Sequence, residues 1–392
     1  MCCVRNIAPA EDEKIMRVLI LSTYERTGGA AIAADRLRHA LEKGGVEVSV
    51  LCRKNIGWWP KGWKPQSWSS ILERVQVFVR NGFRMRDLWA VDTGWLGQDI
   101  TGCEAFRRAD VVHLHWVNQG FLSLRTIARI LRSGKRVVWT MHDEWPLDGI
   151  VHYADTIGAD SARRLNALNN SVIERKRWVY AQGHITFVAC SEWLKGISEV
   201  KPLAQGQEIV AIPNAIDTDV FRPADRLSLR EEFGLPRDRK VVLFVSQKVT
   251  DERKGVRYLD EATAMLGDEV RVVAVGRDIP YIYDREKMAR LYAACDAFVT
   301  PSLQDNLPNT IMEAMACGTP CVGFNVGGIP EMIDHKVNGY VARYKDAADL
   351  ARGINYVLTE DGLGVACREK VMREYSEQAV GEKYTNVYLI DN

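Results

Sequence analysis

The sequence predicts an α/β protein with two doubly wound parallel-sheet domains that face a cleft. The chain has 392 residues, which is more than one hydrophobic core usually supports. Short β-branched runs alternate with amphipathic stretches, as in parallel sheets covered by helices on both faces. The alternation stops at a polar, proline-bearing stretch, residues 222–239, and then starts again. We therefore expect two sheets with a domain boundary at this stretch.

Each half has its own set of strand-like runs. The first half has six, at 17–21, 46–51, 111–115, 137–140, 185–189 and 209–212, and the second half has four, at 241–245, 270–275, 297–300 and 321–324. We predict domains over residues 16–215 and 240–370, a linker at 216–239, and a C-terminal helix within 371–392 that packs back toward the first domain. Ligands of such sheets bind beyond the carboxyl ends of the strands, so the motifs at those ends are the informative ones.

Composition excludes several classes of protein. The net charge is only +1, which argues against a nucleic-acid binder with a basic surface. Nine scattered cysteines, an odd number, predict neither a disulfide framework nor a metal site. The first 15 residues contain no signal-like stretch, and no run reaches the 18 apolar residues of a membrane span. We expect a cytoplasmic protein.

A glycine pair follows the first strand. Gly28 and Gly29 stand directly before an expected helix, residues 30–41. Glycines let the backbone approach a ligand closely, and a helix N-terminus offers free amides to a phosphate. A plain connection between strand and helix is an equally good interpretation. The spacing is not GxGxxG, so a dinucleotide fold gains little support.

Two further strand ends carry ionisable groups. His142 and Asp143 follow the strand at 137–141, where His142 is either a polar catalytic group or a histidine bound by loop backbone. Lys248, Arg253 and Lys254 follow the strand at 241–245. Cations at such a junction suit a diphosphate whose charge grows as it departs, although a solvated loop has the same composition.

The segment 301–320 is the most informative. Pro308 fits the first turn of a helix, and Gly318 with a following proline would end it. The amides of Asn306 and Leu307 would then face a ligand. Glu313, between apolar neighbours, needs a partner, for which a ribose diol is suitable. A second glycine-to-helix step, Gly327 to Glu331, would supply another set of amides.

These segments, together with residues 213–217, resemble the retaining glycosyltransferases called group 1, or family four, over residues 16–390. Residues 304–310 and 142–146, with His152 and Tyr153, are similar to the branch that makes colanic acid and capsules. The resemblance implies two Rossmann-like domains of the glycosyltransferase-B fold. It also implies a UDP- or GDP-sugar donor, no other cofactor and no metal, and a glycan or lipid-linked acceptor in surface polysaccharide synthesis.

The resemblance also implies roles for individual residues. The first domain would face the acceptor and the second would hold the donor. Glu313 would bind the ribose, and Lys254, with Arg253, the diphosphate. Asp305, Asn306 and Leu307 would face the transferred sugar, while Gly28 and Gly29 would close on the phosphates or the acceptor. His142 would line the reaction centre, so that His142, Lys254 and Asp305 form the catalytic set. The departing phosphate oxygen would accept the acceptor's proton.

Three features depart from the family pattern. Asp305 stands where the family commonly has a glutamate, and Lys248 is the substitute for a missing arginine. The chain is short near residues 152–160 and 276–287, where a strand before Asp284 would be lost. Two alternatives therefore stay open. Asp217 and Asp219 formally match the DxD motif of metal-dependent transferases, and a catalytically weakened carbohydrate- or nucleotide-binding protein would use the same scaffold. A phosphorylase or an epimerase fits less well.

One stretch indicates a membrane surface. Residues 54–89 hold five of the 11 tryptophans, Trp58, Trp59, Trp63, Trp68 and Trp89, and a local excess of basic residues. Residues 70–83 predict an amphipathic helix with Ile71, Val75, Phe78 and Val79 on one side. Peripheral contact with the inner face of the cytoplasmic membrane is one interpretation. Packing of the same side chains on the sheet is the other.

Overall fold

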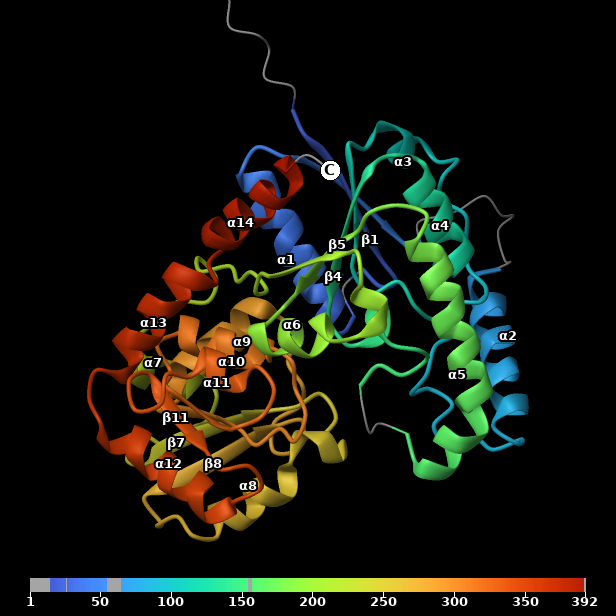
Figure 1. The fold of residues 1–392 in the computed structure, drawn as a ribbon. Coiled ribbons are helices and arrows are strands. Elements are labelled where there is room, and N and C mark those ends of the chain that lie inside the picture. Colours follow the sequence, from blue (N-terminus) through green and yellow to red (C-terminus); the bar gives the residue numbers. More distant parts are fainter. Residues whose placement is uncertain (1–14, 26, 55–64, 154–156, 391–392) are drawn as a thin grey trace, which may run out of the picture.

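The computed structural model describes residues 15–25, 27–54, 65–153 and 157–390 (Figure 1). It contains two parallel sheets, of six and five strands, each covered by helices on both faces. The predicted fold class is thereby confirmed. Trp58, Trp59 and Trp63 lie outside the described residues, as does Arg26 in the loop before Gly28.

The first sheet has the order β2-β1-β3-β4-β5-β6. Alternate residues of β1 point to opposite faces, so that Leu19 and Leu21 join one hydrophobic cluster and Val18 and Ile20 another. The strands are β1 (Arg17–Ser22), β2 (Glu47–Cys52), β3 (Val111–Leu114), β4 (Arg136–Met141), β5 (Thr186–Ala189) and β6 (Glu208–Ala211).

Helices from both ends of the chain cover this sheet. One face packs against α1 (Gly29–Lys43) and α14 (Glu377–Leu389), and the other against α3 (Glu104–Arg108), α4 (Leu124–Arg132), α5 (Ala159–Tyr180) and α6 (Glu192–Glu199). The helix α2 (Pro65–Arg80) lies on the outside of this layer and contacts α5 (Figure 1). No helix in the described ranges is long and apolar enough to cross a bilayer.

The second sheet has the order β11-β10-β9-β7-β8. Its strands are β7 (Lys240–Val245), β8 (Val270–Val275), β9 (Ala297–Thr300), β10 (Cys321–Phe324) and β11 (Gly339–Ala342). The helices α7 (Arg226–Glu232), α9 (Arg285–Ala294), α10 (Asn309–Ala316), α11 (Ile329–Met332) and α13 (Leu363–Glu374) cover one face, and α8 (Val256–Thr263) and α12 (Ala347–Thr359) the other. Between β8 and α9 there is only an isolated bridge, Val275 to Ile279.

The chain returns to the first sheet at its C-terminal end. α13 packs on α10, and α14 packs on α1 (Figure 1). Two tyrosines of α14 reach the buried His113 of β3: Tyr388 hydrogen-bonds its Nδ1 at 2.7 Å, and the Tyr384 ring lies against it. The domain bounds drawn from the sequence stay a prediction, but this contact makes α14 part of the first domain's core.

Candidate active site

A cleft of about 780 Å³ opens between the two sheets. It is lined from the first sheet by residues at or after the ends of β1, β3, β4, β5 and β6, and from the second by residues at or after the ends of β7, β8 and β9 and by the first turns of α10. Eight of the predicted site residues line it: Gly28, Gly29, His142, Lys254, Asp305, Asn306, Leu307 and Glu313. Lys248 and Arg253 are not among its lining residues.

The glycine pair lies where α1 begins. Gly28 has a φ of 89°, in the left-handed region that other residues rarely adopt, and it is the N-cap of α1 without a side-chain hydrogen bond. A Cβ on Gly29 would lie 3.8 Å from the Asn309 amide nitrogen of α10. The first turn of α1 therefore offers its amides directly opposite the second domain.

Lys254 and Asp305 form an ion pair inside the cleft. Lys254 Nζ lies 2.7 Å from Asp305 Oδ2, and the Ser302 hydroxyl is 3.4 Å from the same oxygen. Gly255 holds Lys254 in place: its φ is 66°, and a Cβ there would lie 1.8 Å from the carbonyl oxygen of Pro301. A departing diphosphate would compete with Asp305 for this ammonium group.

The other two predicted cations are placed differently. Arg253 is exposed and forms a bidentate pair with Asp251, at 3.1 and 2.7 Å. Lys248 is also exposed. Lys254 is therefore the cation of this set that lines the cleft.

Glu313 lies in the second turn of α10 and has partners from both domains. One oxygen accepts a hydrogen bond from Arg36 of α1 at 2.5 Å, and the other from the Tyr292 hydroxyl of α9 at 3.0 Å. Arg36 is 2% exposed, and its Nε and Nη1 have no hydrogen-bond partner among the described residues. The carboxylate predicted for the ribose is thus also the acceptor of a buried ion pair across the cleft.

The turn before α10 is fixed by contacts with the first domain. Ser191 donates to the Asn306 side chain at 2.6 Å, and the Asn214 amide donates to Asn309 at 3.1 Å. Gly327 and Gly328 pack under this turn: a Cβ would lie 1.8 Å from the Asp305 carbonyl and 2.1 Å from that of Asn306, respectively.

The Gly327 to Glu331 step serves a different purpose from the predicted one. Neither glycine lines the cleft. Glu331 instead accepts from the amides of Glu192 and Trp193 at 2.8 and 2.6 Å, and so caps α6 of the other domain. The predicted second set of ligand-binding amides is replaced by a support for the Asp305 turn and a contact between domains.

His142 lines the cleft, but its ring nitrogens face inward. Nε2 lies 3.0 Å from His115 Nδ1, and Nδ1 lies 3.6 Å from the Cys190 sulfur. Burial lowers the pKa of His142 to about 4, so the ring is neutral near pH 7. Its backbone carbonyl accepts from the Tyr153 hydroxyl at 3.1 Å. The ring nitrogens of His142 thus contact the side chains of His115 and Cys190, and not the loop backbone that the alternative interpretation expected.

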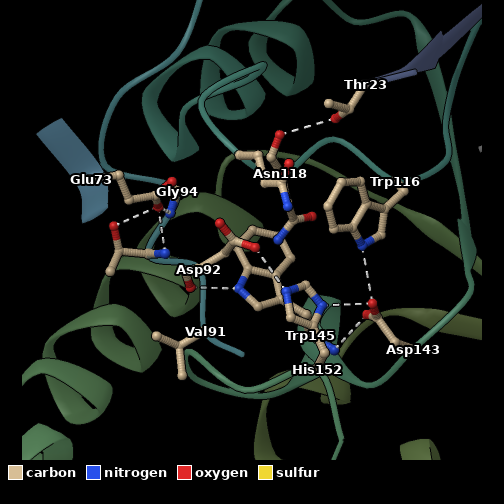
Figure 2. Close-up of polar contacts among 12 residues, drawn as sticks. Thr23, Glu73, Val91, Asp92, Gly94, Trp116, Asn118, Asp143, Trp145 and His152 are labelled. Carbon is tan, nitrogen blue, oxygen red and sulfur yellow. Dashed lines mark hydrogen bonds and ion pairs between the residues drawn. The ribbon is translucent and has the colours of Figure 1, made fainter. Parts of the chain in front are cut away.

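Asp143, the next residue, is held by a charged cluster (Figure 2). His152 lies between two carboxylates, with Nδ1 2.6 Å from Asp143 and Nε2 2.8 Å from Asp92. Burial alone would lower the pKa of His152, but the two carboxylates outweigh it and raise the pKa to about 10. Trp116 donates its indole N–H to Asp143 at 3.1 Å. The positively charged imidazolium thereby fixes a carboxylate and an indole in the cleft wall.

Several residues that line the cleft belong to no recognisable sequence motif. Trp116 stacks with Tyr24 at 6.0 Å between ring centroids, and Tyr281 meets Tyr283 edge to face at 5.0 Å. All four line the cleft. Trp116 follows β3, so its position at a strand end is the one signal that could have singled it out.

The DxD carboxylates have structural partners. Asp217 accepts from the amides of Asp219 and Val220 and lies 3.4 Å from Arg285, while Asp219 lies 3.3 Å from Lys43. Neither aspartate lines the cleft. Among the residues that the structure describes, no group of three or more His, Cys, Asp or Glu side chains could hold a metal ion.

Comparison with known proteins places this geometry in a family. A model described as Glycosyltransferase Family 4 matches residues 27–220, and one described as Glycosyl transferases group 1 matches residues 239–360. The N-acetyl-alpha-D-glucosaminyl L-malate synthase of Bacillus anthracis is 24% identical over 301 residues, which cover 71% of this chain and 74% of that protein.

Two solved structures are similar in fold. The sucrose-phosphate synthase of Thermosynechococcus elongatus has a TM-score of 0.67 at 18% identity, covering 95% of this chain and 98% of that one. The Anabaena protein HepE, solved in complex with UDP-glucose, has a TM-score of 0.60 at 15% identity, covering 95% and 99%. Both family models follow one another along this chain, one for each sheet, and the fold agrees with these structures. The chain belongs to the group 1, family four glycosyltransferases of the glycosyltransferase-B fold, and it transfers a sugar from a nucleotide sugar.

Proposed function

We propose that the protein transfers a hexosyl unit, with retention of configuration and without a metal ion, onto a glycan or lipid-linked acceptor of a surface polysaccharide. The observation that carries this proposal is the placement of Lys254 and Glu313 in one cleft, facing the amide-rich start of α1. A cation, a carboxylate and a helix N-terminus are what a nucleoside diphosphate sugar needs for its phosphates and its ribose.

The proposed roles follow from the contacts. Lys254 neutralises the diphosphate as the bond between the sugar C1 and the phosphate oxygen breaks. Glu313 accepts the ribose hydroxyls, and Asp305, Asn306 and Leu307 line the place of the transferred sugar. Gly28 and Gly29 approach the phosphates from the first domain. Lys248 and Arg253, outside the cleft lining, contribute only to the field around the phosphates.

No protein base is needed in this proposal. The acceptor oxygen bonds to C1, and its proton passes to the departing phosphate oxygen. The neutral His142 cannot supply a positive charge, which leaves Lys254 to stabilise the leaving group. The structural contacts of Asp217 and Asp219 support a reaction in which cations replace a divalent ion.

The identity of the acceptor is the part of the proposed function that the similar proteins constrain least. Similar proteins are named for unlike products, a glucosaminyl malate in one and sucrose phosphate in another. We place the protein in the colanic-acid and capsule branch because of residues 304–310 and the His142 to Tyr153 loop. An acceptor on a lipid carrier would bring the protein to the inner face of the cytoplasmic membrane.

A thermal-shift screen of UDP- and GDP-sugars tests the donor. UDP is the first candidate, because the similar HepE structure holds UDP-glucose. A donor at 100 times its dissociation constant stabilises the protein by about 2.7 kcal/mol. Glu313→Gln should weaken binding of both the donor and the bare nucleoside diphosphate. Unchanged affinity in this variant would contradict the ribose assignment.

Release of the sugar from the bound donor, with and without EDTA, tests the chemistry. We expect turnover to persist in EDTA. Complete loss that Mn²⁺ restores would refute metal independence. A different result is that the protein binds a donor and shows no turnover when extracts that contain acceptors are added. That result would favour the alternative of a catalytically weakened protein that only binds its ligand.

A further inference from the structure

The helix α2 exposes an apolar stripe. Trp68, Ile71, Leu72, Val75 and Val79 recur at intervals of three and four residues and therefore share one face of the helix. Between 47% and 58% of each side chain is exposed. The opposite face, with Glu73, Arg74 and Val77, is buried. These apolar side chains thus do not pack on the sheet, and Phe78, expected on the same side, is half-buried against the core.

The residues after α2 extend the exposed surface. Phe83, Met85 and Trp89 are each 65% to 69% exposed. Phe83 packs edge to face on Phe78, and Trp89 lies over Arg74, which places both next to the helix. We call six residues the α2 face: Trp68, Ile71, Leu72, Val75, Val79 and Phe83. So many exposed large apolar side chains on one helix and the turn after it mark an interaction surface.

Within the segment from Trp68 to Arg86 the exposed charges have one sign, and the exposed Asp160 of α5, which pairs with Arg163, is an acidic side chain near Arg84. Arg80, Arg84 and Arg86 are exposed. The acidic Glu73 is buried, and its carboxylate accepts from the amides of Thr93 and Gly94 at 2.6 and 2.9 Å (Figure 2). From Trp68 to Arg86, no acidic side chain is therefore exposed.

The combination of exposed apolar side chains and neighbouring arginines suits an anionic bilayer better than a protein partner. Indoles favour the headgroup boundary, aliphatic side chains enter the acyl region, and arginines pair with lipid phosphates. Each basic residue near such a surface contributes about 1 kcal/mol of attraction.

The segment after α2 is tied to the start of α5. The Gly158 amide donates to Asp87 at 3.1 Å, directly after the arginines. Tyr153, five residues before Gly158 in the chain, lines the cleft. An extended chain of five residues spans at most about 18 Å, so Gly158 lies within about that distance of the cleft lining.

We propose that the α2 face docks the protein on a bilayer of anionic lipid, with the apolar stripe inserted and Arg80, Arg84 and Arg86 at the headgroups. The benefit for a lipid-linked acceptor rests on the proposed function, but the docking does not. Binding to lipid and binding of the donor can therefore fail independently.

Sedimentation with sucrose-loaded vesicles of phosphatidylcholine containing 0, 20 or 40% phosphatidylglycerol tests the proposal. Binding should rise with phosphatidylglycerol and fall in 0.5 M salt. The double variant Val75→Asp, Val79→Asp should lower the partition coefficient at least tenfold, because it places carboxylates in the inserted stripe. Arg84→Ala should lower it about fivefold, which corresponds to the attraction of one basic residue.

Val365→Asp is the matched control, because Val365 is 65% exposed on α13 of the other domain. It should bind vesicles as the unchanged protein does, and all variants should keep the thermal shift given by UDP. Absence of vesicle binding at low salt would overturn the proposal. So would binding that survives the double aspartate variant, since another surface would then be responsible. A dimer in light scattering that this variant disperses, without vesicle binding, would show that a second copy covers the α2 face.

Discussion

At the scale of single residues, Lys254 and Glu313 each have an ion-pair partner within the protein. Lys254 contacts Asp305 within the second domain, and Glu313 contacts Arg36 of the first. A donor must compete with Asp305 for the ammonium group, whereas the carboxylate of Glu313 retains lone pairs for ribose hydroxyls. The two residues should therefore respond differently to substitution.

Lys254→Ala should lower turnover about a hundredfold, because it removes the cation that stabilises the departing diphosphate. Arg257→Ala is the control, since Arg257 is exposed on α8 and pairs with Glu261 outside the cleft. Lys248→Ala and Arg253→Ala should cost less than Lys254→Ala. Steady-state release of the sugar from the donor measures all four, and equal losses in the three lysine and arginine variants near the cleft would contradict the assignment.

Arg36→Met should lower the thermal midpoint by about 5 °C, because it leaves the largely buried Glu313 without its cation. Adding Glu313→Gln to this variant should cost little more, so the double-mutant cycle should show strong coupling. Arg257→Met breaks an exposed pair and should change the midpoint by about 1 °C or less. Additive effects of the Arg36 and Glu313 substitutions would show that the pair does not join the domains.

At the scale of elements, the loop between β4 and α5 is ordered by buried charges. His152 bridges Asp92 and Asp143, and Lys201 bridges Glu144 and Asp148. Lys176 Nζ donates to the Asp148 and Gly149 carbonyls at 2.9 Å and lies over the Trp145 ring, and burial lowers the pKa of this amine well below its usual value. Each carboxylate of the His142 to Trp145 motif is thus part of the loop's own support.

His152→Gln should destabilise the protein by roughly 3 kcal/mol at pH 7, since it leaves the buried Asp143 without its cation, whereas Asp92 keeps its ion pair with Arg74. The folded pKa, about 10, lies above the ordinary 6.5. The stabilisation is therefore complete below pH 6.5 and is lost as the pH rises toward 10. Denaturant titrations at pH 6, 8 and 9.5 should show the difference between variant and parent shrinking. A constant difference would mean that the imidazole is not charged in the folded protein.

Most helices and strands could be predicted from the sequence because their patterns depend on residues that are close together in the chain. All ten predicted strands exist, since near-continuous apolar runs bounded by polar turns identify buried parallel strands. β11 was missed because it begins with glycine, so that only three apolar residues, 340–342, remain of its run. α7 lies in the polar stretch predicted as linker, where only Leu227 and Leu229 interrupt the charged residues and serine. α2 was predicted, but the direction of its apolar face was left open.

At the scale of the whole molecule, the first sheet buries three histidines in their neutral form. The pKa of His113 falls to about 3 and that of His142 to about 4, and that of His115 lies well below 6.5, in each case chiefly because of burial. The unfolded chain binds protons at these sites near pH 6.5, and the folded chain does not.

The stabilisation that these three neutral histidines contribute should therefore be fully present above pH 6.5. The free energy of unfolding should fall as the pH drops toward 4. Each histidine contributes a slope on the order of 1.4 kcal/mol per pH unit within that window. His152 has the opposite dependence, so stability should peak near neutral pH. Denaturant midpoints at pH 7, 6 and 5 measure the slope, and His113→Gln should reduce it. A flat profile from pH 7 to 5 would show that the buried histidines are protonated.

The sequence by itself determined the two parallel sheets, the restart near residue 240, and eight of the residues that line the cleft. It could do so because strand periodicity, glycine turns and helix starts depend on neighbours in the chain, and because ligands of such sheets meet the carboxyl ends of strands. Confirming the roles of these residues is a matter for the experiments above.

Only the tertiary structure decided which groups meet across the cleft. Arg36 and Glu313 are 277 positions apart, and His152 finds Asp92 across 60. Gly327 packs against the backbone of Asp305 and does not line the cleft. Lys248 and Arg253 also lie outside the cleft lining. The apolar stripe of α2 faces outward because two of the three charged residues of the helix, Glu73 and Arg74, have buried partners at 88–94. Such pairings depend on contacts between distant segments, which no local pattern encodes.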